Sequence, residues 1–299
     1  MAMNPRPANE TPGGSQVMIL VVRPHPDDES SATGGMLACY AARGMRTGVI
    51  TCTGGEEGEI HDPDLDPVAD FPRLGEIRAR ELRTACAVLG VSELRLLGYR
   101  DSGMKDTPAN GHPEAFCNAD AVEAAGRLVR AIRELRPLVM VTEAPGGGYP
   151  HPDHVRCHQV SVDAFHAAGD PSAYPEAGPA WQVPKLYAVA QIDDGCWEAL
   201  LPEFKAAGLD VSWLERRRDR ARERGAGPET ATVALDVSPY SEVQRRALLA
   251  HRTQIPQDSF SIRMSEELRR RAFATTYFIR LHPVPAPGER EADLLDGLD

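Results

Sequence analysis

The segment Val17-Met18-Ile19-Leu20-Val21-Val22-Arg23-Pro24-His25-Pro26-Asp27-Asp28-Glu29 carries the strongest fold signal in this 299-residue chain. Its first six residues are apolar and mostly β-branched, which is typical of a strand buried on both faces of a sheet. An imidazole and several carboxylates follow this strand directly. In open α/β sheets, ligands bind at the carboxyl ends of the strands. The segment therefore predicts a parallel sheet with a ligand site at this edge.

A second polar cluster, Tyr149-Pro150-His151-Pro152-Asp153-His154, follows another apolar run at residues 139–142. Imidazole nitrogens and carboxylate oxygens are zinc ligands, and Asp27 offers a further carboxylate as a base. Together the two clusters contain the ligands and acid–base groups of a hydrolytic zinc site. Each cluster alone also fits a turn or a surface loop with histidines. Because both follow a strand-like run and precede a helix-like segment, we favour the zinc site.

Strand-like runs alternate with amphipathic segments through the first 195 residues. The expected strands are residues 17–22, 47–51, 93–97, 138–142 and 185–191, and the expected helices are 35–43, 73–89, 120–135 and 155–168. Such alternation is typical of a parallel sheet with helices on both faces. We therefore predict a Rossmann-like α/β catalytic domain, with a mostly parallel sheet, over residues 16–195.

The pattern changes after residue 195. The sequence predicts helices at 201–208, 213–224 and 242–251 and an antiparallel strand at 232–236. We interpret residues 196–282 as a smaller C-terminal lid on the substrate side. Residues 1–15 and 283–299 are rich in proline and in polar or acidic residues, a composition that predicts flexible tails.

Composition excludes several classes of protein. The net charge of −11 argues against a nucleic-acid partner, which requires a basic face. A membrane partner is not expected, because the chain lacks an apolar stretch of the ~20 residues that span a bilayer. The N-terminal residues lack the apolar core of a signal peptide, so we expect a cytoplasmic protein. The six cysteines form no CxxC pair, which favours reduced thiols over disulfides or a thiolate zinc site.

The motifs resemble those of the LmbE-like family, which includes the N-acetylglucosaminyl-phosphatidylinositol deacetylases. The resemblance covers most of the chain and rests on His25-Pro-Asp-Asp-Glu29, Thr51-Cys-Thr-Gly-Gly-Glu-Glu-Gly-Glu59, Arg100-Asp-Ser-Gly-Met104 and Gly147-Gly-Tyr-Pro-His-Pro-Asp-His154. Within the family, the mycothiol S-conjugate amidase branch is the most similar. That finer resemblance rests on residues 148–162, residues 181–187 and Ala250-His-Arg-Thr-Gln-Ile255.

The resemblance implies a metal site and two catalytic groups. One zinc ion would be bound by His25, Asp28 and His154, with iron(II) as an alternative occupant, because nitrogen and oxygen ligands do not select strictly for zinc. Asp27 would be the general base that takes a proton from the attacking water. His151 would stabilise the oxyanion or protonate the leaving amine.

Other predicted site residues surround these groups. Asp153 is placed to orient His151, and Tyr149 is predicted to donate to the oxyanion or to be a rim aromatic. The resemblance implies that Arg78 and Asp101 bind sugar or inositol hydroxyls, and Glu56 and Glu59, near the mouth of the site, are further candidates. An ion pair with a neighbouring glutamate is the alternative for Arg78, and a solvated acidic loop is the alternative for Glu56.

Two departures from the amidase branch bear on the substrate. This chain has Ala32 where that branch usually has lysine, and Glu143-Ala-Pro-Gly146 where it usually has Tyr-Asp-Glu-Asn. We expect both segments to lie beside the catalytic loops and outside the metal site. His158 follows His154 by one helical turn. We predict that it supports a ligand residue or has a structural role, because a fourth protein ligand would close the open zinc position.

The favoured interpretation is a zinc-dependent amidase that hydrolyses the cysteinyl-glucosamine amide of mycothiol S-conjugates. Such an enzyme would act on a small pseudodisaccharide thiol conjugate, in detoxification or in a thiol-dependent antibiotic pathway such as lincosamide biosynthesis. The alternative is a deacetylase of N-acetylglucosaminyl-inositol or another amino sugar. A metal-free binding protein is disfavoured, because the predicted ligands, the base and His151 are all present. Homo-oligomerisation is left open.

Overall fold

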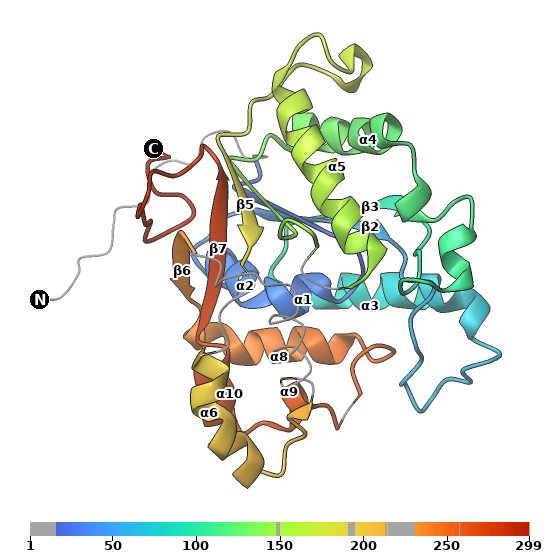
Figure 1. Ribbon diagram of the computed structural model, residues 1–299, viewed down its shortest axis with the longest axis vertical. Helices are drawn as coiled ribbons and strands as arrows, with labels where there is room; N and C mark the ends of the chain where they lie inside the picture. The colour runs from blue at the N-terminus through green and yellow to red at the C-terminus, as the bar shows by residue number, and fades with distance from the viewer. Residues whose placement is uncertain are drawn as a thin grey trace, which may run out of the picture.

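Figure 1 shows a central sheet between layers of helices. The computed structural model describes residues 16–147, 150–190, 195–212, 214, 231–256 and 258–298. Its seven-stranded sheet has the order β3-β2-β1-β4-β5-β7-β6. The strands are β1 (Ile19–Arg23), β2 (Thr47–Thr53), β3 (Glu93–Tyr99), β4 (Val139–Thr142), β5 (Lys185–Val189), β6 (Val233–Asp236) and β7 (Thr275–His282). The first five run parallel and β7 runs antiparallel to both its neighbours, which confirms the predicted mostly parallel sheet.

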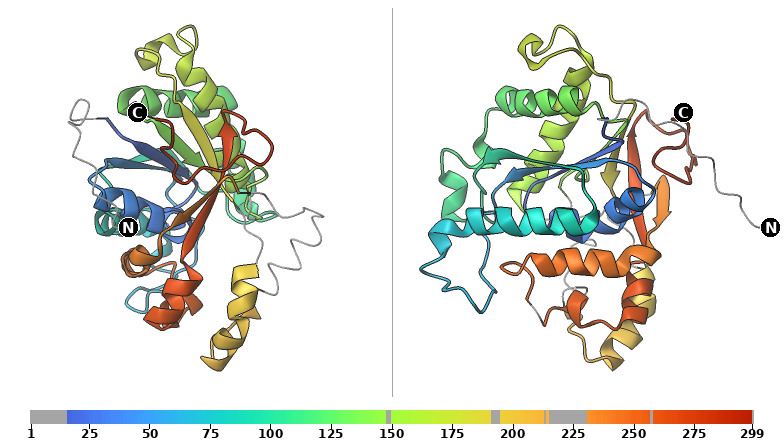
Figure 2. Two further views of the ribbon diagram at one scale, coloured as in Figure 1. Left: turned by 90° about the vertical axis from the view of Figure 1, so that its left-hand side faces the viewer. Right: turned by 180° about the vertical axis from the view of Figure 1, so that it is seen from behind.

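Helices cover both faces of the sheet. One face carries α4 (Ala121–Leu135) and α5 (Pro152–Gly169), and the other carries α1 (Asp28–Ala32), α2 (Gly34–Ala42) and α3 (Leu74–Leu89), against which α8 (Ser241–Ala250) packs from outside (Figures 1 and 2). Successive residues of a strand point to opposite faces. Accordingly, Leu20 and Val22 of β1 pack in the core with α4 and α5, whereas Ile19 and Val21 pack with α2, α3 and α8. β1 is therefore buried on both faces, as its apolar run predicts.

The helix α5 begins earlier than the sequence pattern predicts, and this matters for the site. Pro152 occupies the first helical position, where its missing N–H costs nothing, and His151 is the N-cap. The helix therefore starts three residues before the predicted residue 155. As a result, the N-cap and the first turn of α5 carry His151, Asp153 and His154.

The C-terminal region contributes two strands to the main sheet. Strands β6 and β7 come from the predicted lid segment, residues 196–282, and extend the sheet beyond β5. The helices α6 (Gly195–Ala206), α9 (Phe260–Arg263) and α10 (Glu266–Ala272) form an outer layer beyond α8. The sequence interpretation missed β7, although its β-branched and aromatic residues favour a strand. The predicted helix 213–224 falls almost entirely outside the described residues, as does the predicted tail 1–15.

Residues 283–298 pack against the fold, which corrects the prediction of a flexible tail there. Leu294 is fully buried in the core with α2 and β5. The Tyr40 hydroxyl donates a hydrogen bond to Asp293 (2.6 Å), and the Lys185 ammonium donates one to Glu291 (2.6 Å). The acidic residues that made this segment resemble a solvated tail are therefore the partners of basic and phenolic groups on the sheet and on α2.

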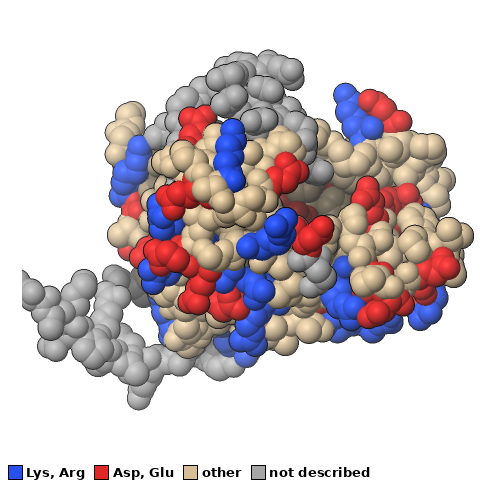
Figure 3. Space-filling model, turned by 90° about the horizontal axis from the view of Figure 1, so that it is seen from below, with Lys and Arg blue, Asp and Glu red and all other residues tan. Residues whose placement is uncertain are grey.

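The surface carries mixed charge. On the face that Figure 3 shows, acidic and basic side chains alternate over the described residues and the surface is hollowed near its centre. Among the described helices, none combines the length and apolarity that crossing a bilayer requires.

Candidate active site

The two polar clusters meet at one edge of the sheet. β1 pairs with β4 in parallel, so the loop after β1 and the segment after β4 both emerge at the carboxyl ends of adjacent strands. A pocket of about 520 Å³ lies where they meet. Of the predicted site residues, this pocket is lined by His25, Asp27, Asp28, Arg78, Asp101, His151 and His154. Tyr149 lies outside the described residues.

Two histidines and one carboxylate converge as the resemblance implies. The ligand atoms of His25, Asp28 and His154 all lie within 4.8 Å of one another. Asp28 Oδ2 is 3.4 Å from His25 Nδ1 and 3.8 Å from His154 Nε2. Two imidazoles and one carboxylate are the donor set of a catalytic zinc site, in which a fourth position stays open to water or substrate. The residues present therefore fit a zinc ion.

A second group that shares His25 fits a metal less well. It consists of His25 with Asp101, His151 and Asp153. The carboxylate of Asp153 already accepts hydrogen bonds from both the backbone N–H and the hydroxyl of Ser102. That of Asp101 accepts a hydrogen bond from the Gly103 N–H at 2.8 Å. Both oxygens of Asp153 are engaged in this way, whereas the hydrogen bond that Asp28 accepts, from the His25 N–H at 3.0 Å, goes to Oδ2, so the group with Asp28 is the better candidate.

The electrostatic environment favours a cation. Burial alone would lower the pKa of His25, but hydrogen bonds to Asp101, Asp153 and Asp28 outweigh it and hold that pKa well above the ordinary value. Burial would likewise raise the pKa of Asp28, and His154, His25 and Arg23 together lower it instead. The carboxylates thus stabilise positive charge at this point, and a divalent metal ion supplies such charge.

Asp27 has a strained backbone and a perturbed carboxyl group. Its φ of 111° is rare for a residue with a side chain, and its N–H donates to Glu29 Oε2 at 2.9 Å. Burial raises the pKa of Asp27 to about 6, although the nearby Arg78 guanidinium acts in the opposite direction. A carboxylate with a pKa near neutrality is matched to the work of a general base.

Arg78 forms hydrogen bonds that stabilise the loop that carries Asp27. The sequence predicts that Arg78 binds substrate, and it does line the pocket, but its guanidinium is buried and engaged. It donates to the carbonyl oxygens of Pro26 (2.6 Å) and Gly55 (2.8 Å) and contacts Asp27 Oδ2 at 3.2 Å. Gly55 has a φ of +71°, and a Cβ there would lie 2.3 Å from this guanidinium. The local structure therefore requires glycine at position 55.

His151 presents one ring nitrogen to the pocket. Its Nδ1 accepts a hydrogen bond from the Asp153 N–H at 3.2 Å, so the proton of the neutral ring resides on Nε2. That Nε2 faces Asp101 Oδ1 at 3.5 Å. The Asp153 carboxylate lies closer to His25 Nε2 (3.2 Å) than to His151 Nδ1 (3.9 Å). Asp153 thus orients His151 through its backbone N–H, and its carboxylate contacts the other histidine.

Two predicted substrate contacts are engaged with other protein groups. The Asp101 carboxylate is buried between His25 and His151, and Glu56 accepts a hydrogen bond from the Asp101 N–H at 2.9 Å. Glu56 therefore supports Asp101, while its neighbours Glu57 and Glu59 line the pocket. The sequence analysis places Glu59 near the mouth of the site, whereas Glu57, in the same motif, is not singled out from the sequence.

The sequence analysis also missed a buried pair behind the catalytic loop. Glu29 and His251 are fully buried, and His251 Nε2 lies 2.8 Å from Glu29 Oε1. Both belong to motifs that carry the family resemblance, but nothing in the sequence indicates that these distant segments touch. The contact joins α8 to the loop that carries Asp27.

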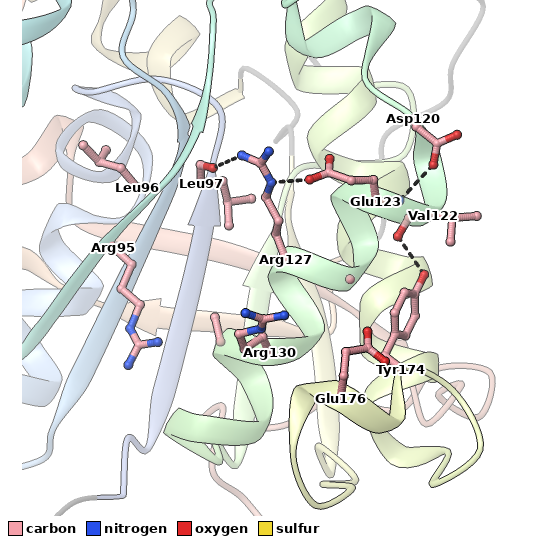
Figure 4. Close-up of a pocket in the computed structure, with 12 residues that line it drawn as sticks. Arg95, Leu96, Leu97, Asp120, Val122, Glu123, Arg127, Arg130, Tyr174 and Glu176 are labelled. Atoms are coloured by element: carbon pink, nitrogen blue, oxygen red, sulfur yellow. Dashed lines mark hydrogen bonds and ion pairs between the residues drawn. The ribbon is translucent and has the colours of Figure 1, made fainter.

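A larger cavity of about 660 Å³ lies elsewhere, against β3 and α4 (Figure 4). Some of its charged groups pair with one another or with the backbone: Arg127 contacts Glu123 and the Leu97 carbonyl oxygen. The Tyr174 hydroxyl donates to the Val122 carbonyl oxygen. This cavity lacks the convergent acid–base groups of the pocket at the sheet edge, so volume alone does not identify the active site.

Comparisons with known proteins identify the family of this chain. Residues 20–165 match the family model described as PIG-L, GlcNAc-PI de-N-acetylase. A 1D-myo-inositol 2-acetamido-2-deoxy-alpha-D-glucopyranoside deacetylase of Acidothermus cellulolyticus is 41% identical over 290 residues, which cover 94% of this chain and 95% of the relative. The enzyme of the same name from Thermobifida fusca is 41% identical over 92% of this chain and 98% of the relative.

Solved structures share the fold. A conserved protein from Thermus thermophilus has a TM-score of 0.60 at 25% identity, over 92% of this chain and 100% of that one. The N,N'-diacetylchitobiose deacetylase of Pyrococcus horikoshii has a TM-score of 0.61 at 18% identity, over 90% and 86% of the two chains. This chain therefore belongs to the GlcNAc-PI de-N-acetylase (LmbE-like) family and is a zinc-dependent hydrolase that cleaves amide C–N bonds.

Proposed function

We propose that this protein removes the acetyl group from N-acetylglucosaminyl-inositol and releases acetate and the free amine. The observation that carries the proposal is that relatives named for this deacetylation are 41% identical across 94% and 92% of the chain. The sequence analysis favoured the S-conjugate amidase because of motifs downstream of residue 147. The similarity to relatives named for deacetylation extends over nearly the full length of the chain, so the deacetylase replaces the amidase as the favoured activity.

In this proposal, His25, Asp28 and His154 hold the zinc ion. When bound there, zinc polarises the amide carbonyl and lowers the pKa of a water molecule. Asp27 accepts the proton of the water that attacks the carbonyl carbon. The C–O bond forms first and places negative charge on the former carbonyl oxygen. The C–N bond then breaks as the C=O bond re-forms, and the proton held by Asp27 ends on the leaving amine.

In this proposal, His151 donates a hydrogen bond to the oxygen of the scissile amide or a proton to its nitrogen. His151 lines the pocket with its Nε2 facing Asp101 Oδ1 at 3.5 Å, and its other nitrogen accepts a hydrogen bond from the Asp153 N–H. A donor held in this way stabilises negative charge that develops on the carbonyl oxygen, or it delivers a proton to the amine. The pocket rim carries Glu57, Glu59 and Gln254, whose polar groups suit the hydroxyls of a sugar and a cyclitol.

The test compares two substrates of one enzyme preparation. We expect kcat/KM for acetate release from N-acetylglucosaminyl-inositol to exceed kcat/KM for amide cleavage of mycothiol S-conjugates. Zinc, Asp27 and His151 would act on the same kind of bond in both substrates. The ratio of the two kcat/KM values therefore reflects only how the enzyme binds the acyl side of each substrate. A preference for every conjugate tried over the acetylated sugar would contradict the proposal and restore the amidase interpretation.

A further inference from the structure

We propose that Glu143, held by Arg23, is a positioning residue that orients the zinc ligand His154. The inference rests on the proposed function, because it takes His154 as a ligand. The sequence analysis placed the Glu143–Gly146 segment outside the metal site and assigned it to substrate preference. The structure instead brings the Glu143 carboxylate into contact with His154.

The two nitrogens of the His154 ring face different partners. Nδ1 lies 3.2 Å from Glu143 Oε2, and Nε2 lies 3.8 Å from Asp28 Oδ2 on the side of the other predicted ligands. A neutral imidazole carries one proton, and a carboxylate beside Nδ1 favours the proton on that nitrogen. The lone pair is then on Nε2, the nitrogen that faces the metal position. Carboxylates that hold a histidine ligand in this way fix its tautomer and its ring orientation.

Arg23 holds Glu143 from the opposite side. It ends β1, its side chain is 4% exposed, and its Nη1 lies 3.0 Å from Glu143 Oε1. The Glu143 side chain is 6% exposed, so neither charge has substantial access to water. Arg23 Nη2 also lies 4.0 Å from Asp28 Oδ1. One buried guanidinium thus connects the carboxylate behind His154 with the carboxylate ligand Asp28.

The backbone around Glu143 is fixed on α5. His158 Nδ1 lies 2.9 Å from the Glu143 carbonyl oxygen, which gives His158 the structural role that the sequence analysis predicts. Gly147 has a φ of +78°, and a Cβ there would lie 2.6 Å from the Val155 nitrogen. The segment after β4 therefore sits tightly on the first turns of α5. This places the Glu143 carboxylate behind His154.

The experiment measures zinc affinity separately from turnover. The dissociation constant for zinc is determined by competition with a chromogenic chelator for the full-length protein and for Glu143→Gln and Glu143→Ala. We expect both variants to bind zinc about 10–100-fold more weakly. Glu143→Gln is nearly isosteric, so it keeps the packing and removes the charge. Arg23→Gln provides a second test, and we expect weaker zinc binding there as well.

Glu291→Gln is the matched control. The Glu291 side chain is also little exposed, at 9%, and is paired with the basic groups of Lys185 and Arg280, but it lies far from the pocket in the C-terminal segment. We expect this variant to lower the melting temperature of the metal-free protein and to leave zinc affinity unchanged. If Glu143→Gln also lowers only the melting temperature and binds zinc as tightly as the unchanged protein, Glu143 is merely structural and the inference is overturned.

The same measurements separate this inference from the proposed function. Weak zinc binding by the Glu143 variants supports the positioning role, whatever the substrate is found to be. Absence of acetate release by the zinc-loaded protein contradicts the proposed function alone. Unchanged zinc affinity in His154→Ala would remove His154 as a ligand and overturn the positioning role of Glu143 with it.

Discussion

His251 on the C-terminal side of α8 contacts Glu29 next to the catalytic loop, with 2.8 Å between Nε2 and Oε1 and both side chains fully buried. The other oxygen of the same carboxylate accepts the N–H of Asp27 at 2.9 Å. A residue more than 220 positions away in the sequence thus helps to hold the strained backbone of the proposed base.

We predict that His251→Ala reduces kcat more than it changes KM. Loss of the imidazole leaves the buried Glu29 carboxylate without this partner, and the carboxylate can no longer fix the Asp27 N–H as tightly. A displacement of the base by a fraction of an ångström costs turnover on the order of 10-fold or more. Steady-state kinetics test this, with His251→Gln as the control that retains a donor. Equal loss in both variants would contradict the role of the hydrogen bond.

Metal removal should abolish activity. We expect about one zinc ion per chain by metal analysis, loss of turnover after chelation, and recovery when zinc is added back, because the donor set has two nitrogens and one carboxylate. Iron(II) added without oxygen is expected to restore activity as well, since this donor set does not select strictly for zinc. Full turnover in chelated protein would rule out the metal site as the catalytic centre.

Replacement of the proposed base should separate binding from chemistry. We predict that Asp27→Asn and His151→Ala keep the fold and bind zinc, yet lose turnover by roughly 10²–10⁴-fold, the contribution typical of a general acid or base. Zinc content, melting temperature and kcat are measured on the same preparations. A near-normal kcat for Asp27→Asn would exclude this carboxylate as the base.

Because of Glu291 in the C-terminal segment, the free energy of unfolding should vary with pH in the acidic range. Burial alone would raise the pKa of Glu291, but hydrogen bonds from Lys185 and Tyr187 outweigh it, and that pKa lies below its ordinary value of 4.5. A lowered pKa in the folded state means that the stabilisation is present above the ordinary pKa. It is lost as the pH falls through the lowered value.

We therefore predict that Glu291→Gln is less stable than the unchanged protein at pH 7, and that the difference shrinks as the pH falls below about 4.5. Denaturant unfolding of both proteins across this range measures the free energy of unfolding. A difference that stays constant with pH would show that the charge of Glu291 contributes nothing to stability.

The location of the site could be predicted because it depends on local rules. An apolar run predicts a buried parallel strand, and the carboxyl ends of β1 and β4 must share one edge, so His25 and His154 meet there. Glu143, which contacts His154, and His251, which contacts Glu29, could not be assigned in the same way. Their contacts depend on which side of a loop or helix faces the site, and residue type does not encode this.

Composition misled the analysis at the C-terminus for a related reason. The acidic and proline-rich segment after residue 282 resembles a solvated tail when each residue is considered alone. In the structure, Glu291 accepts a hydrogen bond from Lys185, Asp293 accepts one from Tyr40, and Leu294 is buried in the core. These charges are satisfied by partners more than 100 residues earlier, and only the folded chain brings them together.

The place of β7 in the sheet has a consequence for synthesis of the protein on the ribosome. β7 is the last strand of the chain to be translated, yet it lies between β5 and β6. Until residues 275–282 emerge, β5 is an open edge and β6 has no neighbour in the sheet. During synthesis, the edge of β5 therefore stays exposed until β7 is made, and an exposed strand edge can pair with another chain. Any stop codon shortly before Thr275 makes that state permanent, so such truncated products are expected to aggregate while still carrying every residue of the catalytic pocket.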